Sequence, residues 1–245
     1  MMVKAPWLGC YIGYEHRSFN FSVEGSGAAK LRPMGDRKKL ISDKYSIKLQ
    51  PLIEEVLPDG RVFRKLPLDN GWESTAPASD DVETVTYQGT VKGDARFEVT
   101  LEFSGDEIRA GGKVIDKGSL KNPRFVVEVK IPNVYYYDRD EEKRDDKAKK
   151  DRINFLMTDG KKLKLDVLTP LDAEAKEYND PGIAEARIDL AGFKGHRFDL
   201  AAGDNAYFRL WNRGEAELFR GFTFAWTPDA EKDPDGKGRM LLKVR

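Results

Sequence analysis

Residues 204–213 (DNAYFRLWNR) carry aromatic and guanidinium side chains at alternating positions. Successive side chains of an extended strand point to opposite faces, so we expect Phe208 and Leu210 to face the core. The face turned away from the core then holds Tyr207, Arg209, Trp211 and Arg213. Aromatic rings stack on the apolar faces of sugars, and guanidinium groups donate hydrogen bonds to hydroxyl or carboxylate oxygens. This pattern predicts a ligand-binding surface suited to a glycan or a similar polar ligand.

Residues from other segments could extend this surface. The next expected strand, 217–226, supplies Arg220 and Trp226 in phase with each other, and three tyrosines at 135–137 lie at an expected strand end. Binding groups often gather at such ends. The residues that we expect to bind the ligand are Tyr207, Arg209, Trp211, Arg213, Arg220, His16 and Arg17.

The same residue types have a second explanation. Trp, Tyr and Arg are enriched in the energetic centres of protein interfaces, and arginine stems also pack beside aromatic rings. Trp211 and Tyr207 could therefore fill a second core or a subunit interface, either in a homo-oligomer or with another protein. Burial of the two rings would favour this alternative.

Signatures of the common enzyme classes are absent from the sequence. It contains no HExxH, GxSxG or Walker motif, and residues 25–30 (GSGAAK) lack the third glycine and the following helix of a dinucleotide loop. We therefore expect no cofactor and no metal site. A sugar- or polysaccharide-active enzyme would need His16 or His196 as its acid–base group, with a carboxylate partner that the sequence does not identify. Our first hypothesis is a non-catalytic protein that binds a carbohydrate or a similar polar ligand. The second hypothesis is a sugar- or polysaccharide-active enzyme, and the third is a structural or assembly protein.

Composition narrows the range of partners. The 42 Lys and Arg residues balance 42 Asp and Glu residues, so no net charge favours nucleic acid or an anionic membrane. No apolar stretch reaches the roughly 18 residues of a membrane span, and we expect a soluble protein. The compartment stays open, with a periplasmic or secreted location if a signal peptide preceded this numbering. The single cysteine, Cys10, allows no intramolecular disulfide, and we expect it to be buried.

The elements that must position these residues are mostly β-strands. Apolar and polar residues alternate strictly in 96–103, 124–131 and 161–167, as strands with one buried face require. Turn sequences such as Asp159-Gly160 separate neighbouring segments and predict antiparallel hairpins. The expected strands are 7–12, 18–23, 43–49, 61–66, 82–91, 95–103, 107–115, 123–131, 152–157, 161–167, 184–190, 196–200, 206–212, 217–226 and 240–244.

Apolar stripes on these strands define the expected core. The stripes are Phe19, Phe21 and Val23; Val85, Tyr87 and Val91; Phe97, Val99, Leu101 and Phe103; Phe125, Val127, Val129 and Ile131; and Leu163, Leu165 and Val167. We expect residues 1–245 to form one all-β domain, a large antiparallel β-sandwich with one short connector helix. Large β-sandwiches of this length often bind or process carbohydrate, and the supersandwich of mutarotase-like proteins is an example. The comparison with this chain is an analogy of fold alone.

Three segments depart from the strand pattern. Capping and stop signals predict the helix within residues 169–179. Residues 67–79 are expected to form a loop, with Trp72 anchoring it on the core or stacking on a ligand. The charged segment 138–152 has no apolar stripe, so we expect a solvated, peripheral loop that could be deleted with little effect on the melting temperature.

Overall fold

The structure is a computed structural model that describes residues 12–23, 28–34, 46–74, 82–135, 140–168, 170–171, 176–193, 195–212, 216–217 and 221–245. Backbone pairings join 17 strands of these ranges into one curled antiparallel sheet. The sheet folds into two layers, and the pair Ile183–Phe208 connects a strand of one layer to a strand of the other. The predicted all-β sandwich is confirmed.

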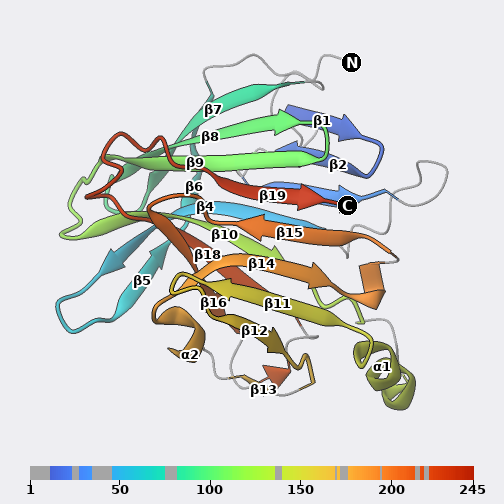
Figure 1. The fold of residues 1–245 in the computed structure, drawn as a ribbon. Helices are drawn as coiled ribbons and strands as arrows, with labels where there is room; N and C mark the ends of the chain where they lie inside the picture. Colours follow the sequence, from blue (N-terminus) through green and yellow to red (C-terminus); the bar gives the residue numbers. More distant parts are fainter. Residues whose placement is uncertain are drawn as a thin grey trace.

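The front sheet is the layer nearest the viewer in Figure 1, where β7, β8, β9, β19, β15, β14, β11 and β12 follow one another from top to bottom. In order of pairing, its strands within the described ranges are β6 (Pro67–Ser74), β7 (Thr84–Val91), β8 (Arg96–Ser104), β9 (Glu107–Asp116), β19 (Met240–Val244), β15 (Arg197–Ala201), β14 (Ile183–Asp189), β11 (Arg152–Met157) and β12 (Lys162–Leu165). Strand β19 thus joins the β7–β9 hairpins to the strands that follow residue 150.

The back sheet lies behind it. Its described strands, in order of pairing, are β1 (Ile12–His16), β2 (Phe19–Val23), β3 (Ala29–Pro33), β4 (Ile47–Val56), β10 (Pro123–Ile131), β18 (Phe222–Pro228) and β16 (Ala206–Trp211), and β5 (Val62–Lys65) pairs with the end of β4. A separate two-stranded pair is formed by β13 (Pro170–Leu171) and β17 (Ala216–Glu217).

Aromatic contacts between the two sheets mark the core. The rings of Phe97 and Phe125 lie 5.5 Å apart, and those of Phe155 and Phe224 lie 5.8 Å apart. The five predicted stripes all lie in this core, and only Leu163 among them is half-buried rather than buried.

The charged segment is a helix, so the predicted loop is wrong. Helix α1 (Glu141–Ala148) is capped by Asp140, whose carboxylate accepts a hydrogen bond from the backbone N–H of Lys143 at 3.2 Å. Ala148 is fully buried. Helix α1 buries little apolar surface and is stabilised instead by its N-cap and by ion pairs between residues three apart. A search for an apolar stripe does not detect these interactions.

The other two departures also differ from expectation. The predicted helix is the short α2 (Lys176–Asn179), which covers only the end of the predicted range, and Pro170 lies in β13; residues 169 and 172–175 lie outside the described ranges. No helix in the described part of the chain could cross a membrane.

Residues 67–74 form β6 instead of a loop. The half-buried Trp72 packs edge-on against Tyr87 and Phe97, with ring centroids 5.9 and 5.6 Å apart. Trp72 thus anchors this segment on the core, which is one of the two roles that the sequence offered. The predicted loop is wrong because the cross-strand contact to β7 cannot be read from this segment alone.

Candidate functional site

The outer face of β16 is the surface that alternation predicts for binding. Phe208 and Leu210 are fully buried in the inter-sheet core, as expected. Arg209 points to the opposite face, but it is also buried and binds protein groups. Its Nη2 lies 2.7 Å from Oε2 of Glu54, and its Nε donates to the hydroxyl of Thr227 at 3.1 Å.

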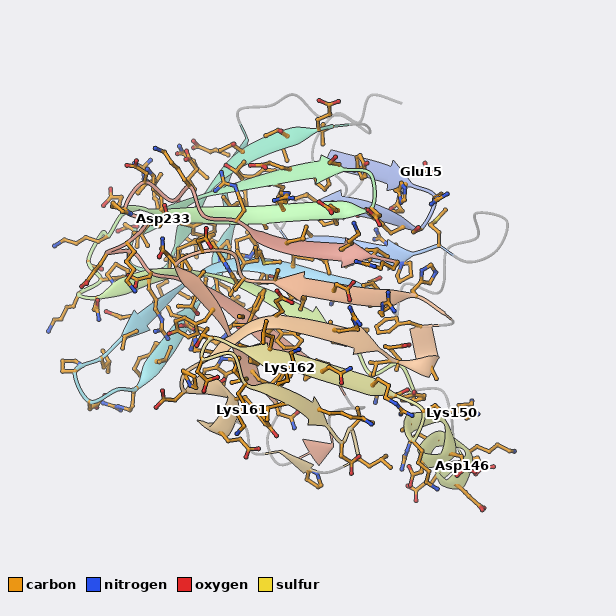
Figure 2. The ribbon with its side chains drawn as sticks, in the orientation of Figure 1. Glu15, Asp146, Lys150, Lys161, Lys162 and Asp233 are labelled. Carbon is orange, nitrogen blue, oxygen red and sulfur yellow. The ribbon has the colours of Figure 1, made fainter. Side chains whose placement is uncertain are left out.

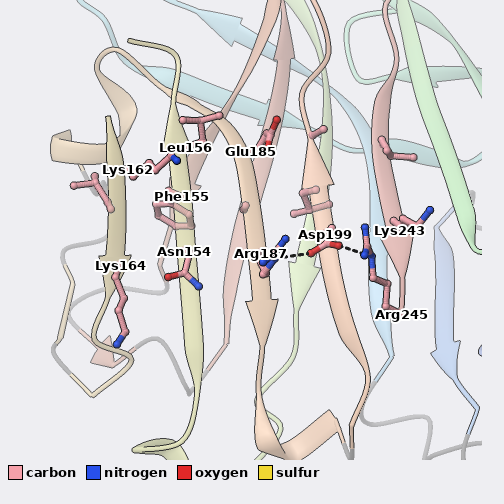
Figure 3. A pocket seen from close by; sticks show the side chains of 15 residues that line it. Asn154, Phe155, Leu156, Lys162, Lys164, Glu185, Arg187, Asp199, Lys243 and Arg245 are labelled. Atoms are coloured by element: carbon pink, nitrogen blue, oxygen red, sulfur yellow. Dashed lines mark hydrogen bonds and ion pairs between the residues drawn. The ribbon is translucent and has the colours of Figure 1, made fainter. Parts of the chain in front are cut away.

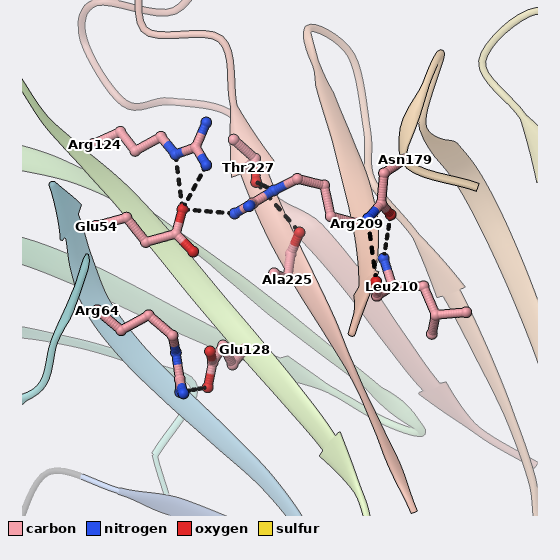
Figure 4. Close-up of polar contacts among 9 residues, drawn as sticks. All are labelled: Glu54, Arg64, Arg124, Glu128, Asn179, Arg209, Leu210, Ala225 and Thr227. Atoms are coloured by element: carbon pink, nitrogen blue, oxygen red, sulfur yellow. Dashed lines mark hydrogen bonds and ion pairs between the residues drawn. The ribbon is translucent and has the colours of Figure 1, made fainter. Parts of the chain in front are cut away.

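Glu54 and Glu128 organise a charge cluster on this face of the back sheet (Figure 4). The cluster consists of Glu54, Arg124, Arg209, Thr227, Glu128, Arg64 and Lys130. Arg124 and Arg209, from different strands, both bind Oε2 of Glu54 at 2.7 Å, while the buried Oε1 has no hydrogen-bond partner in the described part of the chain. Burial lowers the pKa of Arg209, and Arg124 adds to this effect while Glu54 opposes it.

The two aromatic residues of the β16 face are half-buried. Trp211 packs against a small apolar cluster of Leu52, Val126 and Ala225, which are fully buried on the outer face of the back sheet. The guanidinium of Arg209 lies 5.5 Å from the centre of the Trp211 ring. This arrangement has the composition of the small second core that the sequence offered as an alternative.

The remaining predicted site residues lie elsewhere or outside the described ranges. His16 and the exposed Arg17 are at the β1–β2 turn, which Figure 1 places at the upper right, away from β16. Arg213 and Arg220 are outside the described ranges, as is Cys10. The expectation that Trp226 extends the binding surface is wrong. Trp226 is fully buried between the sheets, because it shares the inner face of β18 with Phe222 and Phe224.

A concave surface lies on the other side of the molecule. It is an open groove of about 720 Å³ on the outer face of the front sheet, across β12, β11, β14, β15 and β19 (Figure 3). Figure 2 shows Lys162 of this groove in the lower part of the front sheet. The charged and amide side chains that line the groove are Asn154, Lys162, Lys164, Glu185, Arg187, Asp199, Lys243 and Arg245. None of the residues predicted to bind a ligand lines it.

Strand register arranges the groove in two rows that can be followed in Figure 3. The apolar row is Lys162, Leu156, Glu185, Ala201 and Leu241. Its name comes from Leu156, Ala201 and Leu241, which are half-buried, whereas Lys162 and Glu185 are exposed. The polar row is Lys164, Asn154, Arg187, Asp199 and Lys243. Neighbouring strands lie about 4.8 Å apart, so each row is roughly 19 Å long, and the rows are about 7 Å apart along the strands.

The charges of the groove differ between its ends. Near β19, Nζ of Lys243 lies 2.9 Å from Glu107 and 3.3 Å from Asp106; these contacts raise the pKa of Lys243, and the Lys243 hydrogen bond lowers that of Glu107. Asp199 in the middle contacts Arg187, Arg197 and Arg245 at 2.8 to 3.8 Å. Near β12, Lys162 and Lys164 are exposed and have no ion-pair partner in the described ranges. The β12 end therefore has the greater surplus of available positive charge.

Sequence patterns could not find the groove, because its residues resemble any solvated outer face. The pairs Lys162/Lys164 and Glu185/Arg187 alternate with core residues as ordinary surface charges do. Only the long-range register of five strands aligns them. The second core had a visible signal, since Val126 breaks the alternation of β10 with an apolar residue in a polar phase.

The fold is a curled antiparallel β-sandwich. No protein-family model matches the sequence, and no curated protein is significantly similar to it.

Two solved structures share the fold. The complex of α-N-acetylgalactosaminidase NagBb from Bifidobacterium bifidum with Gal-NHAc-DNJ matches with a TM-score of 0.59 at 10% identity, over 96% of this chain and 36% of that one. A galactose mutarotase related enzyme from Lactobacillus acidophilus matches with a TM-score of 0.50 at 7% identity, over 96% and 97% of the two chains. The present chain thus spans 36% of the length of the galactosaminidase. At these identities the likeness concerns the fold.

Proposed function

We propose that the protein is a non-catalytic carbohydrate-binding protein and that the groove is its binding surface. The observation that carries this proposal is the pairing of the apolar row with the polar row on one concave face. A sugar ring has apolar C–H faces and a rim of hydroxyl groups, so it needs such a combination. The names of the two structural neighbours, a galactosaminidase and a mutarotase-related enzyme, support a sugar as the ligand class.

The lining of the groove supports binding without catalysis. It includes no histidine, and His196 lies elsewhere, with Nε2 2.7 Å from the carbonyl oxygen of Met34. Its two carboxylates are Glu185 and Asp199, and Asp199 already contacts three guanidinium groups. A glycosidase needs one carboxyl group as proton donor and a second as nucleophile or base. Asp199 is better suited to holding the arginines in place.

The test is calorimetric titration with a panel of neutral and acidic oligosaccharides. Leu156→Ser and Leu241→Ser each remove apolar contact area, and we expect each to weaken binding about fivefold. Leu66→Ser is the matched control, because Leu66 is 51% exposed and does not line the groove. Failure of the unmodified protein to bind any glycan, or equal binding by all three variants, would contradict the proposal. Release of a new reducing end or a change of epimer would contradict its non-catalytic part.

The β16 face stays a separate hypothesis for the ligand site, and Trp211→Ala tests it. If the half-buried ring serves the second core, the variant should lose stability and keep its glycan affinity. If the face binds the ligand, the affinity should fall by about 1–3 kcal/mol with the fold intact.

A further inference from the structure

Asn154 lies between two cations at the β12 end of the groove. On β11 it is directly opposite Lys164 of β12 on one side and Arg187 of β14 on the other. Directly opposed residues have Cβ atoms about 5 Å apart, so the three side chains stand next to one another on the outer face of the sheet, with Asn154 in the middle (Figure 3). All three are donors, since a lysine and an arginine have no acceptor and the amide contributes an NH₂ group.

Part of the donor capacity of this triplet is unused. Lys164 is exposed and has no ion-pair partner in the described ranges. Arg187 contacts Asp199 through Nε at 3.3 Å. A guanidinium group has five N–H donors, so its remaining nitrogens can bind a second acceptor. The triplet can therefore accept an anion without losing its contact with Asp199.

The neighbouring residues indicate what the anion is attached to. Leu156 is two residues along β11 on the same face, about 7 Å away, between Lys162 and Glu185. A sugar ring lying over Leu156 would have a donor on one side and an acceptor on the other for its hydroxyl groups. A carboxylate on that ring would then point toward Asn154.

We propose that Lys164, Asn154 and Arg187 bind the carboxylate of an acidic sugar, a uronate, whose ring lies over Leu156. This inference rests on the proposed function and names the ligand class of the same groove. A nucleic acid fits less well, because the carboxylates of Glu185 and Asp199 interrupt the cations of the groove and would repel a continuous phosphate backbone.

The experiment compares one polymer in two charge states. Polygalacturonate and its fully methyl-esterified form are titrated against the unmodified protein, Lys164→Gln, Arg187→Gln and Arg96→Gln. Arg96 is the matched control, an exposed arginine on β8 of the same sheet, outside the groove. We expect the unmodified protein and Arg96→Gln to prefer the acid. Lys164→Gln and Arg187→Gln should each lose about fivefold in affinity for the acid and none for the ester.

Salt and a nucleic acid complete the test. Raising the ionic strength from about 0.1 M to about 1 M shortens the screening length from about 10 to 3 Å and should abolish the preference for the acid. Equal binding of acid and ester by the unmodified protein would overturn the uronate assignment and leave glycan binding standing. Binding of neither polymer nor any neutral glycan would overturn the proposed function as well. Equal affinity for a single-stranded oligonucleotide of matched charge would show general polyanion binding and overturn the inference.

Discussion

At the scale of single residues, the charge cluster shows how the back sheet tolerates buried charge. One oxygen of Glu54 neutralises two arginines that reach it from β10 and β16. Charges leave water at a high cost, which is recovered only where the partners are close and hydrogen-bonded. Arg209 meets this condition through Glu54 and Thr227 together.

Arg209→Met should therefore lower the free energy of unfolding by about 3 kcal/mol, because it leaves Glu54 buried with Arg124 alone. Urea denaturation of the variant measures the loss. The double variant Arg209→Met/Glu54→Leu should recover much of it, since an apolar pair has no charge to desolvate. A double variant that is less stable than the single one would contradict this explanation.

The residue scale also shows where sequence patterns reach their limit. Alternation correctly assigned Phe208 and Leu210 to the core, because it is a local property of an extended chain. It could not assign Arg209 to a buried ion pair, because Glu54 is 155 residues away in the sequence. The triplet around Asn154 was missed for the same reason.

At the scale of elements, the β11 strand and the short helices are fixed by polar contacts. Asp151, between α1 and β11, accepts hydrogen bonds from the hydroxyl of Tyr135 at 2.6 and 2.7 Å and from the backbone N–H of Ala191 at 2.8 Å. Burial raises the pKa of Asp151 to about 6 despite these bonds, and it raises that of Tyr135 as well. Asp151 thus ties the start of β11 to the turn after β14.

The raised pKa of Asp151 predicts a pH dependence. An unfolded Asp titrates near 3.9, so the contribution of this group to stability is complete below about pH 4 and is lost as pH rises through about 6. Asp151→Asn removes the titration and keeps an acceptor. Relative to the unmodified protein, its free energy of unfolding should rise by about 2 kcal/mol between pH 4 and 7, measured by denaturation at each pH. Asp146→Asn, on the exposed side of α1, is the control, and a pH-independent difference for Asp151→Asn would contradict the assignment.

The edge of β16 gives a second prediction at this scale. Asn179 of α2 accepts a hydrogen bond from the backbone N–H of Leu210 at 2.7 Å and donates one to its carbonyl at 3.2 Å, as a neighbouring strand would. Asn179→Leu should cost about 1–2 kcal/mol and expose a strand edge to other chains. Thermal melts with light scattering measure both effects. Asn179→Asp keeps the acceptor but loses the donor, so its melting temperature should fall between those of the unmodified protein and Asn179→Leu. An unchanged melting temperature for Asn179→Leu would contradict the role of Asn179 at this strand edge.

At the scale of the whole molecule, the two sheets meet through large aromatic residues. The ring of Phe125, on the back sheet, contacts that of Phe97 on the front sheet. Its centre lies 6.5 Å from the centre of the Trp226 ring. Phe125→Ala should cost roughly 3–5 kcal/mol in denaturant unfolding. Phe63→Ala, at a side chain that is 47% exposed on β5, should change the stability by less than about 0.5 kcal/mol. A loss below about 1 kcal/mol for Phe125→Ala would show that the sheets do not depend on this contact.

Sequence patterns predicted much of this architecture and little of its pairing. The class, the stripes and most strands follow from alternation and turn chemistry. Strand β3 was not expected, since AKLRP is short and ends in proline, and β6 was taken for a loop. Residues 13–16 of β1 and 50–56 of β4 also lie outside the expected strands. The order β9-β19-β15 joins segments about 130 and 40 residues apart, and no local pattern encodes such distances.

The position of β19 bears on how the chain is made. Residues 240–244 form hydrogen bonds with 107–110 on one side and 198–201 on the other, and both partners leave the ribosome earlier. Until residues 240–244 emerge, the facing edges of β9 and β15 have no strand between them. Edges left in this state recruit strands from other chains, and long-range pairings of this kind form slowly. Closure of the front sheet therefore waits until residues 240–244 have been made, and the interval before it is when a chaperone would matter most.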